Sequence, residues 1–261
     1  MRLAAPAMTA AVIEGAADGG ADVLDLGMVG TEMIYHAVAP LGLDGGICVT
    51  ASHNPKEYTG MKIVRRGALP VGGDSGLEDV RRRAQAGFGP VTRRGDVRAE
   101  DVWPSFVEKV LSFVDVEALR PLKIVVDAAN GMAGVMLPPV LERLPGIEIV
   151  RCFFEPDGTF PNHEADPLKR ENLEDLINAV KRSGAQLGVA FDGDGDRAMF
   201  VDDQGEPITA DLITGLLAAS QLRRHGGRGL ILYDLRSSRA TAEAIAEAGG
   251  SPEMCRVGHA F

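Results

Sequence analysis

Residues 187–197 read Leu-Gly-Val-Ala-Phe-Asp-Gly-Asp-Gly-Asp-Arg, and this stretch indicates both a fold class and a site. Its first five residues form a short apolar run that is typical of a buried strand. The next six place three carboxylates two positions apart, with glycines between them and an arginine directly after. Loops at the carboxyl ends of strands are where open α/β sheets bind their ligands. The stretch therefore predicts an α/β fold with a ligand site at the end of this strand.

Asp192, Asp194 and Asp196 repel one another unless a positive charge lies among them. Carboxylate oxygens suit hard cations such as Mg²⁺, and the intervening glycines let the chain curl so that alternate side chains converge. Mg²⁺ usually keeps coordination positions for water or a phosphate oxygen. The loop therefore predicts one Mg²⁺ per chain with a phosphorylated ligand beside it.

Two other interpretations of this loop fit its sequence less well. Asp and Gly are also common in solvated turns, but three aspartates in register directly after an apolar strand are unusual for a turn. A calcium-binding EF-hand loop needs Gly at its sixth position and Glu at its twelfth. Counted from Asp192, those positions hold Arg197 and Asp203, and a strand precedes the loop where an EF-hand has a helix. The magnesium interpretation is therefore favoured.

The composition bounds the class of protein. The chain has 261 residues, of which 45% are apolar and 25% charged, as in ordinary globular proteins. Its formal net charge of −10 provides no basic field, so nucleic acid is not expected as a partner. The cysteines at positions 48, 152 and 255 form no C-x-x-C pair, which indicates a reduced, cytoplasmic compartment. No apolar run approaches the ~20 residues that span a bilayer, and the N-terminal residues are spaced as one face of a helix, so no membrane partner is expected.

Short strands and helices alternate along the chain, as in parallel sheets covered by helices on both faces. Thr31 and Asp211 are expected to cap the helices that they begin. Pro138 and Pro139 are expected to interrupt a helix. We expect helices over 6–17, 31–38, 77–86, 101–113, 133–144, 171–182, 211–222 and 237–248, and strands over 23–26, 46–50, 61–65, 123–127, 147–154, 187–191 and 229–234.

A second group of reactive side chains follows the strand expected over 46–50. Ser52, His53 and Asn54 lie in the sequence Thr-Ala-Ser-His-Asn-Pro, and Lys62 lies at the start of the next strand. A lone serine is a weak nucleophile and needs an activating partner. No G-x-S-x-G sequence surrounds Ser52, so a hydrolase triad is not expected.

Taken together, the two loops indicate phosphoryl transfer. A phosphate on Ser52 would add an oxygen to the shell of a cation held by the three aspartates. The cation and Arg197 would neutralise charge on the phosphoryl group as it transfers, which is the main source of catalysis in this reaction. Lys62 and His53 could move the proton of a sugar hydroxyl.

The two motifs, in this order and spacing, resemble those of the α-D-phosphohexomutases, specifically the phosphomannomutase/phosphoglucomutase branch. Residues 157–163, Asp-Gly-Thr-Phe-Pro-Asn-His, are similar to a third loop of that family, and the similarity extends along nearly the whole chain. The resemblance implies successive mixed-sheet α/β domains around a central cleft. It also implies a phosphoserine at Ser52 that contributes to the metal site, and the following further residues: catalytic His53, Asn54, Lys62 and Arg197, metal-binding Asp192, Asp194 and Asp196, and substrate-binding Arg236 and His259.

The sequence departs from that family at both ends. The expected domains are a partial first domain over 1–100, a second domain over 101–203 and a partial third domain over 204–261. The fourth domain of the family, with the clamp that holds the substrate phosphate, is not expected within these 261 residues. Positioning of this kind supplies roughly 7–11 kcal/mol of a reaction barrier, so impaired activity is expected.

The resemblance implies an enzyme that interconverts hexose 1-phosphate and hexose 6-phosphate, an intramolecular phosphotransferase. A hexose 1,6-bisphosphate would serve as its intermediate and activator. Gly195 favours mannose or glucose phosphates over glucosamine phosphate, whose enzymes usually have alanine there. The alternatives are a non-catalytic Mg²⁺-binding remnant, a slow phosphatase, or a mutase with a glucosamine phosphate substrate. The expected partner is a phosphosugar, and the expected state is a monomer or weak homodimer.

Overall fold

The structure is a computed structural model that describes residues 2–87 and 89–258. Its α-helices are α1 (Ala5–Asp18), α2 (Thr31–Val38), α3 (Leu77–Ala86), α4 (Trp103–Leu111), α5 (Ala133–Met136), α6 (Pro138–Leu141), α7 (Glu174–Ser183), α8 (Ala210–Arg224) and α9 (Arg239–Glu247). Its strands are β1 (Val23–Asp25), β2 (Gly45–Thr50), β3 (Gly60–Arg65), β4 (Leu69–Pro70), β5 (Val97–Ala99), β6 (Leu122–Asp127), β7 (Ile147–Cys152), β8 (Leu187–Phe191), β9 (Ala198–Asp202), β10 (Pro207–Ile208), β11 (Leu230–Asp234) and β12 (Ser251–Cys255).

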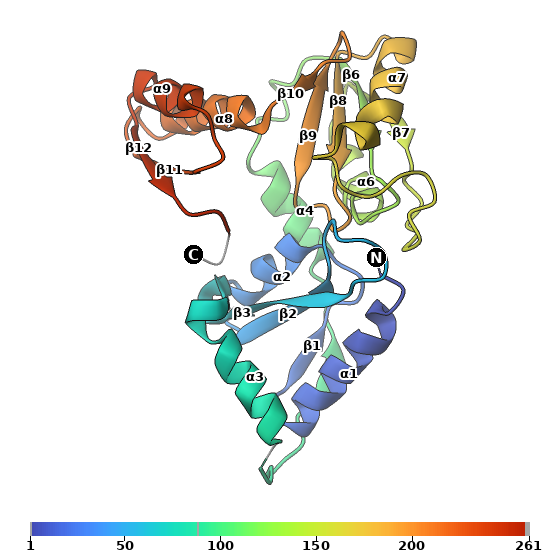
Figure 1. The fold of residues 1–261 in the computed structure, drawn as a ribbon, viewed down its shortest axis with the longest axis vertical. Helices are drawn as coiled ribbons and strands as arrows, with labels where there is room; N and C mark the ends of the chain where they lie inside the picture. The colour runs from blue at the N-terminus through green and yellow to red at the C-terminus, as the bar shows by residue number, and fades with distance from the viewer. Residues whose placement is uncertain (1, 88, 259–261) are drawn as a thin grey trace.

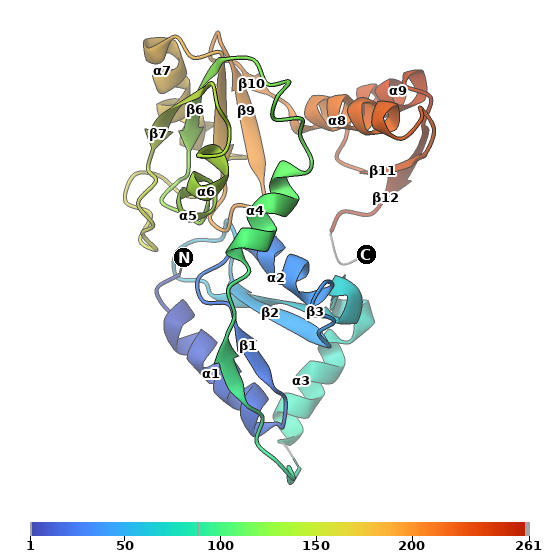
Figure 2. The same ribbon diagram turned by 180° about the vertical axis from the view of Figure 1, so that it is seen from behind.

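These elements form three groups in chain order, which lie at the bottom, upper right and upper left of Figure 1. The first group contains α1 to α3 with β1 to β5, the second contains β6 to β10 with α5 to α7, and the third contains α8, α9, β11 and β12. α4 connects the first group to the second, as the reverse view shows (Figure 2). The predicted domain boundaries at residues 100 and 203 stay predictions.

A five-stranded mixed sheet forms the centre of the second group, with the strand order β10-β9-β8-β6-β7. β6 pairs in parallel with β7 and β8, whereas β9 runs antiparallel to β8. α7 covers one face, where its buried Leu176 and Val180 pack in one cluster with Val125 of β6 and Val201 of β9. The mixed α/β fold predicted from the sequence is confirmed, and residues 192–197 connect β8 to β9.

The first group departs from the expected parallel arrangement. β2, β3 and β4 form an antiparallel sheet, and only β1 and β5 pair in parallel. The cause is the connection between β2 and β3, because residues 51–59 are too few for a crossover helix and a short loop joins antiparallel neighbours. As a consequence Lys62, which lies opposite Cys48, is at the same end of the sheet as Ser52.

Two predicted helix caps are wrong. α2 begins at Thr31, but its N-cap is Gly30 and no side chain caps the helix. The Thr31 hydroxyl instead donates to Asp194 of the second group at 3.2 Å. α8 has its N-cap at Thr209, and Asp211 lies in its first turn. The residue type of Thr31 alone would assign its side chain to capping. The side chain instead binds Asp194, which is distant in the sequence.

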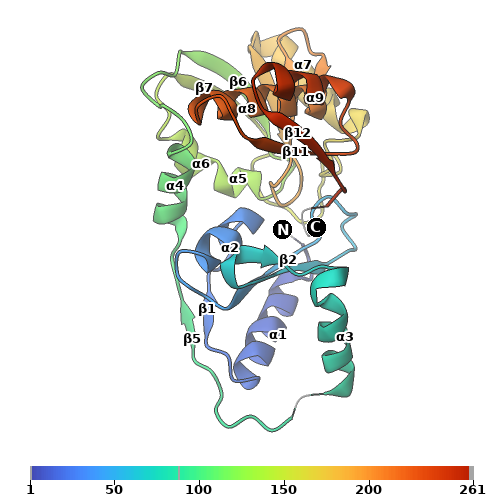
Figure 3. The same cartoon turned by 90° about the vertical axis from the view of Figure 1, so that its left-hand side faces the viewer.

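The other helices follow the expected pattern with small changes at their ends. α3 has the predicted limits, and Pro138 begins a separate helix after α5. Strands β4, β5, β9, β10 and β12 were not predicted. In the third group β12 pairs in parallel with β11, and α8 packs against α9 through buried Leu222 and Ile245 (Figure 3). Within the described residues, no helix combines the length and the apolar character needed to cross a bilayer.

Candidate active site

Ser52 lies on the turn that follows β2, in a conformation that few residues other than glycine adopt. Its φ is 50°, and such left-handed residues cost about 1–3 kcal/mol unless their surroundings stabilise them. The Ser52 N–H donates to Thr50 Oγ1 at 3.0 Å, and the Asn54 N–H donates to the Ala51 carbonyl at 2.9 Å. The turn therefore holds the Ser52 hydroxyl at the end of the antiparallel sheet.

Hydrogen bonds to Asp192 and the conformation of one glycine give the acidic loop its curved shape. Asp192 Oδ1 accepts hydrogen bonds from the N–H groups of Gly195 at 3.1 Å and Arg197 at 3.2 Å. Gly195 has a φ of 81°, which favours glycine because it has no Cβ. As a result Asp192, Asp194 and Asp196 each present one oxygen, and these oxygens lie within 4.8 Å of one another.

The two loops meet at the Ser52 hydroxyl. Ser52 Oγ donates to Asp192 Oδ2 at 2.7 Å and accepts from Arg197 Nη2 at 2.5 Å. The carboxylate attracts the hydroxyl proton and the guanidinium stabilises negative charge on the oxygen, which is the arrangement that an activated serine needs. The structure therefore joins residues that lie 140 positions apart in the sequence.

His53 lies beside the same hydroxyl and is neutral. Its Nδ1 is 3.3 Å from Ser52 Oγ and also contacts Arg197 Nη2. Burial, together with the positive charge of Arg197, lowers the pKa of His53 below its usual value. Because a guanidinium nitrogen can only donate, Nδ1 accepts and the ring proton belongs on Nε2. That nitrogen is thus the one with a proton to give.

Lys62 forms the main ion pairs between the first group and the acidic loop. Its ammonium is 2.8 Å from Asp194 Oδ2 and 2.5 Å from Asp196 Oδ2. Burial alone would lower the pKa of Lys62, but the hydrogen bonds to these carboxylates raise it overall. Asp194 also accepts from the hydroxyls of Thr31 at 3.2 Å and Thr50 at 2.9 Å. Although burial opposes it, the bond to Lys62 lowers the pKa of Asp194, so this buried carboxylate is charged.

The donor set fits a hard divalent cation. All the convergent ligand atoms are oxygens, as Mg²⁺ and Ca²⁺ require. Asp194 Oδ1 is buried and has no hydrogen-bond partner among the described residues, which is costly for a carboxylate oxygen unless an ion binds it. Burial and the neighbouring charge of Asp194 raise the pKa of Asp192, so an added positive charge would relieve repulsion there.

Four residues at this site were missed in the sequence. Thr31 and Thr50 bind Asp194, and the buried Arg2 donates to the main chain of the Ser52 turn. Glu32 has a buried Oε2 without a partner among the described residues, and burial together with Asp196 and Asp194 raises its pKa to about 7. Only Thr50 carried a local signal, because it ends the strand that leads into the turn.

The remaining predicted residues take no part in the hydrogen bonds between the Ser52 turn and the acidic loop. Asn54 is exposed on the Ser52 turn. Arg236 follows β11 and pairs with Asp234 at 2.5 Å, and within the described part of the chain it forms no hydrogen bond or ion pair with the acidic loop. His259 lies outside the described residues.

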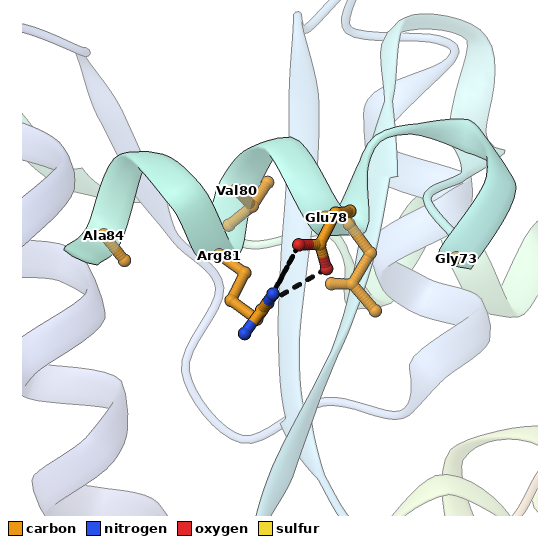
Figure 4. Close-up of a pocket in the computed structure, with 6 residues that line it drawn as sticks. Gly73, Glu78, Val80, Arg81 and Ala84 are labelled. Atoms are coloured by element: carbon orange, nitrogen blue, oxygen red, sulfur yellow. Dashed lines mark hydrogen bonds and ion pairs between the residues drawn. The ribbon is translucent and has the colours of Figure 1, made fainter. Parts of the chain in front are cut away.

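A hollow of about 380 Å³ lies along α3, away from the residues described above. Glu78 and Arg81, which form an ion pair, both line it, together with Gly73, Leu77, Val80 and Ala84 (Figure 4). None of the predicted site residues borders it, so the candidate site is the meeting point of the Ser52 turn and the acidic loop.

Fold and site together define an α/β protein in which a serine hydroxyl lies between a carboxylate and a guanidinium, beside an acidic loop whose oxygens fit a divalent cation. Residues 1–87 match the family model for α/β/α domain I of phosphoglucomutase/phosphomannomutase, and residues 104–205 match the model for domain II. These two matches cover more than half of the chain, and the chain therefore belongs to the phosphoglucomutase/phosphomannomutase family. The family resemblance predicted from the motifs is confirmed.

Individual relatives agree with this assignment. The whole chain is 44% identical to a phosphomannomutase of Salmonella montevideo and covers 59% of it. It is 42% identical to a protein named phosphohexose mutases from Xanthomonas campestris pv. campestris and covers 58% of it. The crystal structure of a phosphoglucomutase/phosphomannomutase family protein from Burkholderia thailandensis superposes with a TM-score of 0.87 at 38% identity, over 99% of this chain and 57% of that one. The chain thus spans less than two thirds of the length of these relatives.

Proposed function

We propose that the chain performs the phosphoserine chemistry of a phosphohexomutase, which interconverts hexose 1-phosphate and hexose 6-phosphate through a hexose 1,6-bisphosphate. The single observation that carries the proposal is the position of the Ser52 hydroxyl between Asp192 Oδ2 at 2.7 Å and Arg197 Nη2 at 2.5 Å. The relatives named phosphomannomutase support mannose or glucose phosphates as the substrate class.

Each residue of the site has a role in this proposal. When a bisphosphate donates to the protein, the bond between phosphorus and the sugar oxygen breaks as the bond to Ser52 Oγ forms. Asp192 accepts the Ser52 proton, and Lys62 supplies a proton to the leaving sugar oxygen. Arg197 neutralises charge on the phosphoryl group, and His53 with Asn54 binds its oxygens.

The charges of the site favour a divalent cation together with a phosphate. Three carboxylates of the acidic loop face the cations Lys62, Arg197 and, near by, Arg2. A phosphate on Ser52 adds about −1.5 to −2 charges at neutral pH. One Mg²⁺ held by Asp192, Asp194, Asp196 and an oxygen on Ser52 would restore the balance, and when bound it supplies charge neutralisation for the transfer. Arg236 and His259 are proposed to contact the sugar.

The first test is phosphorylation of the protein. Incubation with glucose 1,6-bisphosphate and Mg²⁺ should add one phosphate per chain, detected by intact mass and assigned to Ser52 by peptide mapping. Ser52→Ala should take up none. The control is Ser105→Ala in α4, away from the Ser52 turn, which should be labelled like the unmodified chain. Labelling that persists in Ser52→Ala would place the acceptor elsewhere.

The second test is turnover. Glucose 1-phosphate with a trace of the bisphosphate should yield glucose 6-phosphate in a coupled assay. Release of inorganic phosphate at the rate at which glucose 1-phosphate is consumed would instead identify a phosphatase. No product over many protein equivalents would overturn mutase activity for this chain and leave its family membership intact.

A further inference from the structure

Arg2 binds the turn that carries Ser52. Its guanidinium donates through Nη1 to the Pro55 carbonyl at 2.9 Å and through Nη2 to the Ser52 carbonyl. The side chain is buried, with the residue only 5% exposed, although both of its acceptors are neutral. A buried arginine normally binds a carboxylate or phosphate. Two main-chain carbonyls of one turn are therefore unusual partners for this side chain, and filling the core alone would not require them.

The two hydrogen bonds of the Ser52 main chain fix the direction of its hydroxyl. On one side, the Ser52 N–H donates to Thr50 Oγ1 at 3.0 Å. On the other side, the carbonyl accepts from Arg2. Ser52 has a φ of 50°, so it holds an uncommon conformation that needs support from its surroundings. With the groups on both sides of its Cα bound, Oγ points at Asp192 and Arg197.

Arg2 also contacts the loop of residues 157–163 in the second group. Its guanidinium carbon lies 5.2 Å from the centre of the Phe160 ring, within the range of a cation–π contact. A Cβ on Gly158 would come within 3.5 Å of the Arg2 main chain, so this segment and the loop lie against each other. Arg2 therefore links the Ser52 turn with a loop of the group that supplies the acidic site.

We propose that Arg2 is a positioning residue, which holds Ser52 in its left-handed conformation so that Oγ faces Asp192 and Arg197. The inference rests on the proposed phosphoserine chemistry. An arginine suits the task because its planar fork binds two carbonyls at once, whereas a lysine ammonium is a compact point donor. Its fixed positive charge also interacts electrostatically with Asp194 and Asp192, in the region where a phosphate on Ser52 would need neutralisation.

The test compares Arg2→Gln, Arg2→Lys and the control Arg83→Gln on the exposed face of α3. For each full-length chain, the rate of Ser52 phosphorylation is measured against the concentration of glucose 1,6-bisphosphate. Arg2→Gln should lower the maximal rate by about 100-fold, the usual penalty for a displacement of about 1 Å, with little change in the half-saturating concentration. Arg2→Lys should recover part of the rate, and Arg83→Gln should match the unmodified chain.

The same variants are examined by hydrogen–deuterium exchange over residues 49–58, with β6 as the internal reference. Faster exchange of this segment in Arg2→Gln, with β6 unchanged, is expected because the turn loses its anchor. A purely structural role would lower the fraction of chains that react, whereas positioning lowers the rate at which folded chains react. If Arg2→Gln does not fold, Arg2→Lys is the variant on which the proposal is judged.

An unchanged maximal rate together with unchanged exchange over 49–58 would overturn the inference. If the unmodified chain takes up no phosphate, the proposed function fails, and exchange alone decides the role of Arg2. In that case faster exchange in Arg2→Gln supports positioning of the turn, and unchanged exchange overturns it.

Discussion

Gly193 lies where the main chain of the acidic loop comes close to the Ser52 turn. A Cβ built on Gly193 would come 2.6 Å from the Ser52 carbonyl oxygen, and that oxygen already accepts from Arg2. The Gly193 carbonyl in turn accepts from the Met132 N–H at 3.0 Å, and moving the loop away from Ser52 would strain or break this bond. The absence of one side chain therefore lets a serine and an aspartate from different groups form a hydrogen bond.

Gly193→Ala should push the two loops apart. We expect the free energy of unfolding to fall by about 1–3 kcal/mol, as in other overpacked sites, and Ser52 phosphorylation to slow. The matched control is Gly15→Ala in α1, where an added Cβ meets nothing within 4 Å. There the same change should raise stability by up to about 1 kcal/mol, because alanine favours helix. Equal effects of the two substitutions in urea denaturation would contradict the close-approach explanation.

At the scale of elements, the third group depends on a contact between the starts of α8 and α9. Asp211 lies in the first turn of α8, where the helix dipole favours a negative charge. Hydrogen bonds from Ser238, the N-cap residue of α9, and from Thr209 lower the pKa of Asp211 to about 2. Thr241 of α9 donates back to the Asp211 carbonyl at 3.0 Å. Each helix start therefore supports the other.

The lowered pKa makes this contribution depend on pH. Since the folded value of about 2 lies below the ordinary value of 3.8, ionised Asp211 stabilises the fold above pH 3.8, and the effect is lost as the pH falls toward 2. The free energy of unfolding should therefore exceed that of Asp211→Asn at pH 7, and the difference should shrink between pH 4 and pH 3. Ser238→Ala should weaken this pH dependence. A difference that stays constant over the same range in denaturant titrations would refute the assignment.

At the scale of the whole molecule, Lys62 holds the first and second groups together. Its side chain is 17% exposed and that of Asp194 only 4%, so their ion pair is shielded from water. The proposed metal site and this pair share the same carboxylates. The ammonium and a bound cation therefore compete for the same negative charge, and stability and metal affinity are linked across the boundary between the groups.

Lys62→Met should destabilise the chain by about 3 kcal/mol in the presence of EDTA, because it leaves a buried carboxylate unpaired. It should also tighten Mg²⁺ binding, measured by calorimetry, because the ammonium no longer repels the ion. Added Mg²⁺ should then raise the melting temperature of Lys62→Met more than that of the unmodified chain, with about 2.7 kcal/mol of stabilisation at one hundred times the dissociation constant. Asp194→Asn is the control that should lose the response to Mg²⁺. Weaker Mg²⁺ binding by Lys62→Met would contradict the competition.

The local pattern of the chain determined most of its elements and both reactive loops. The apolar run of residues 187–191 has the limits of β8, the helix of residues 77–86 those of α3, and Pro138 separates α5 from α6. These features depend on properties of residues within a few positions of one another, such as the spacing of apolar residues, the missing N–H of proline and the conformations open to glycine. The acidic loop and the Ser52 turn were recognisable for the same reason.

Only the tertiary structure decided how these parts meet. The use of Thr31 as a donor to Asp194 and the close approach at Gly193 depend on partners far apart in the sequence. Arg2 gave no local signal at all, because its role comes from carbonyl groups about 50 residues away. Which side chains share one small volume is set by the packing of whole elements, and a single sequence does not contain that geometry in any local pattern.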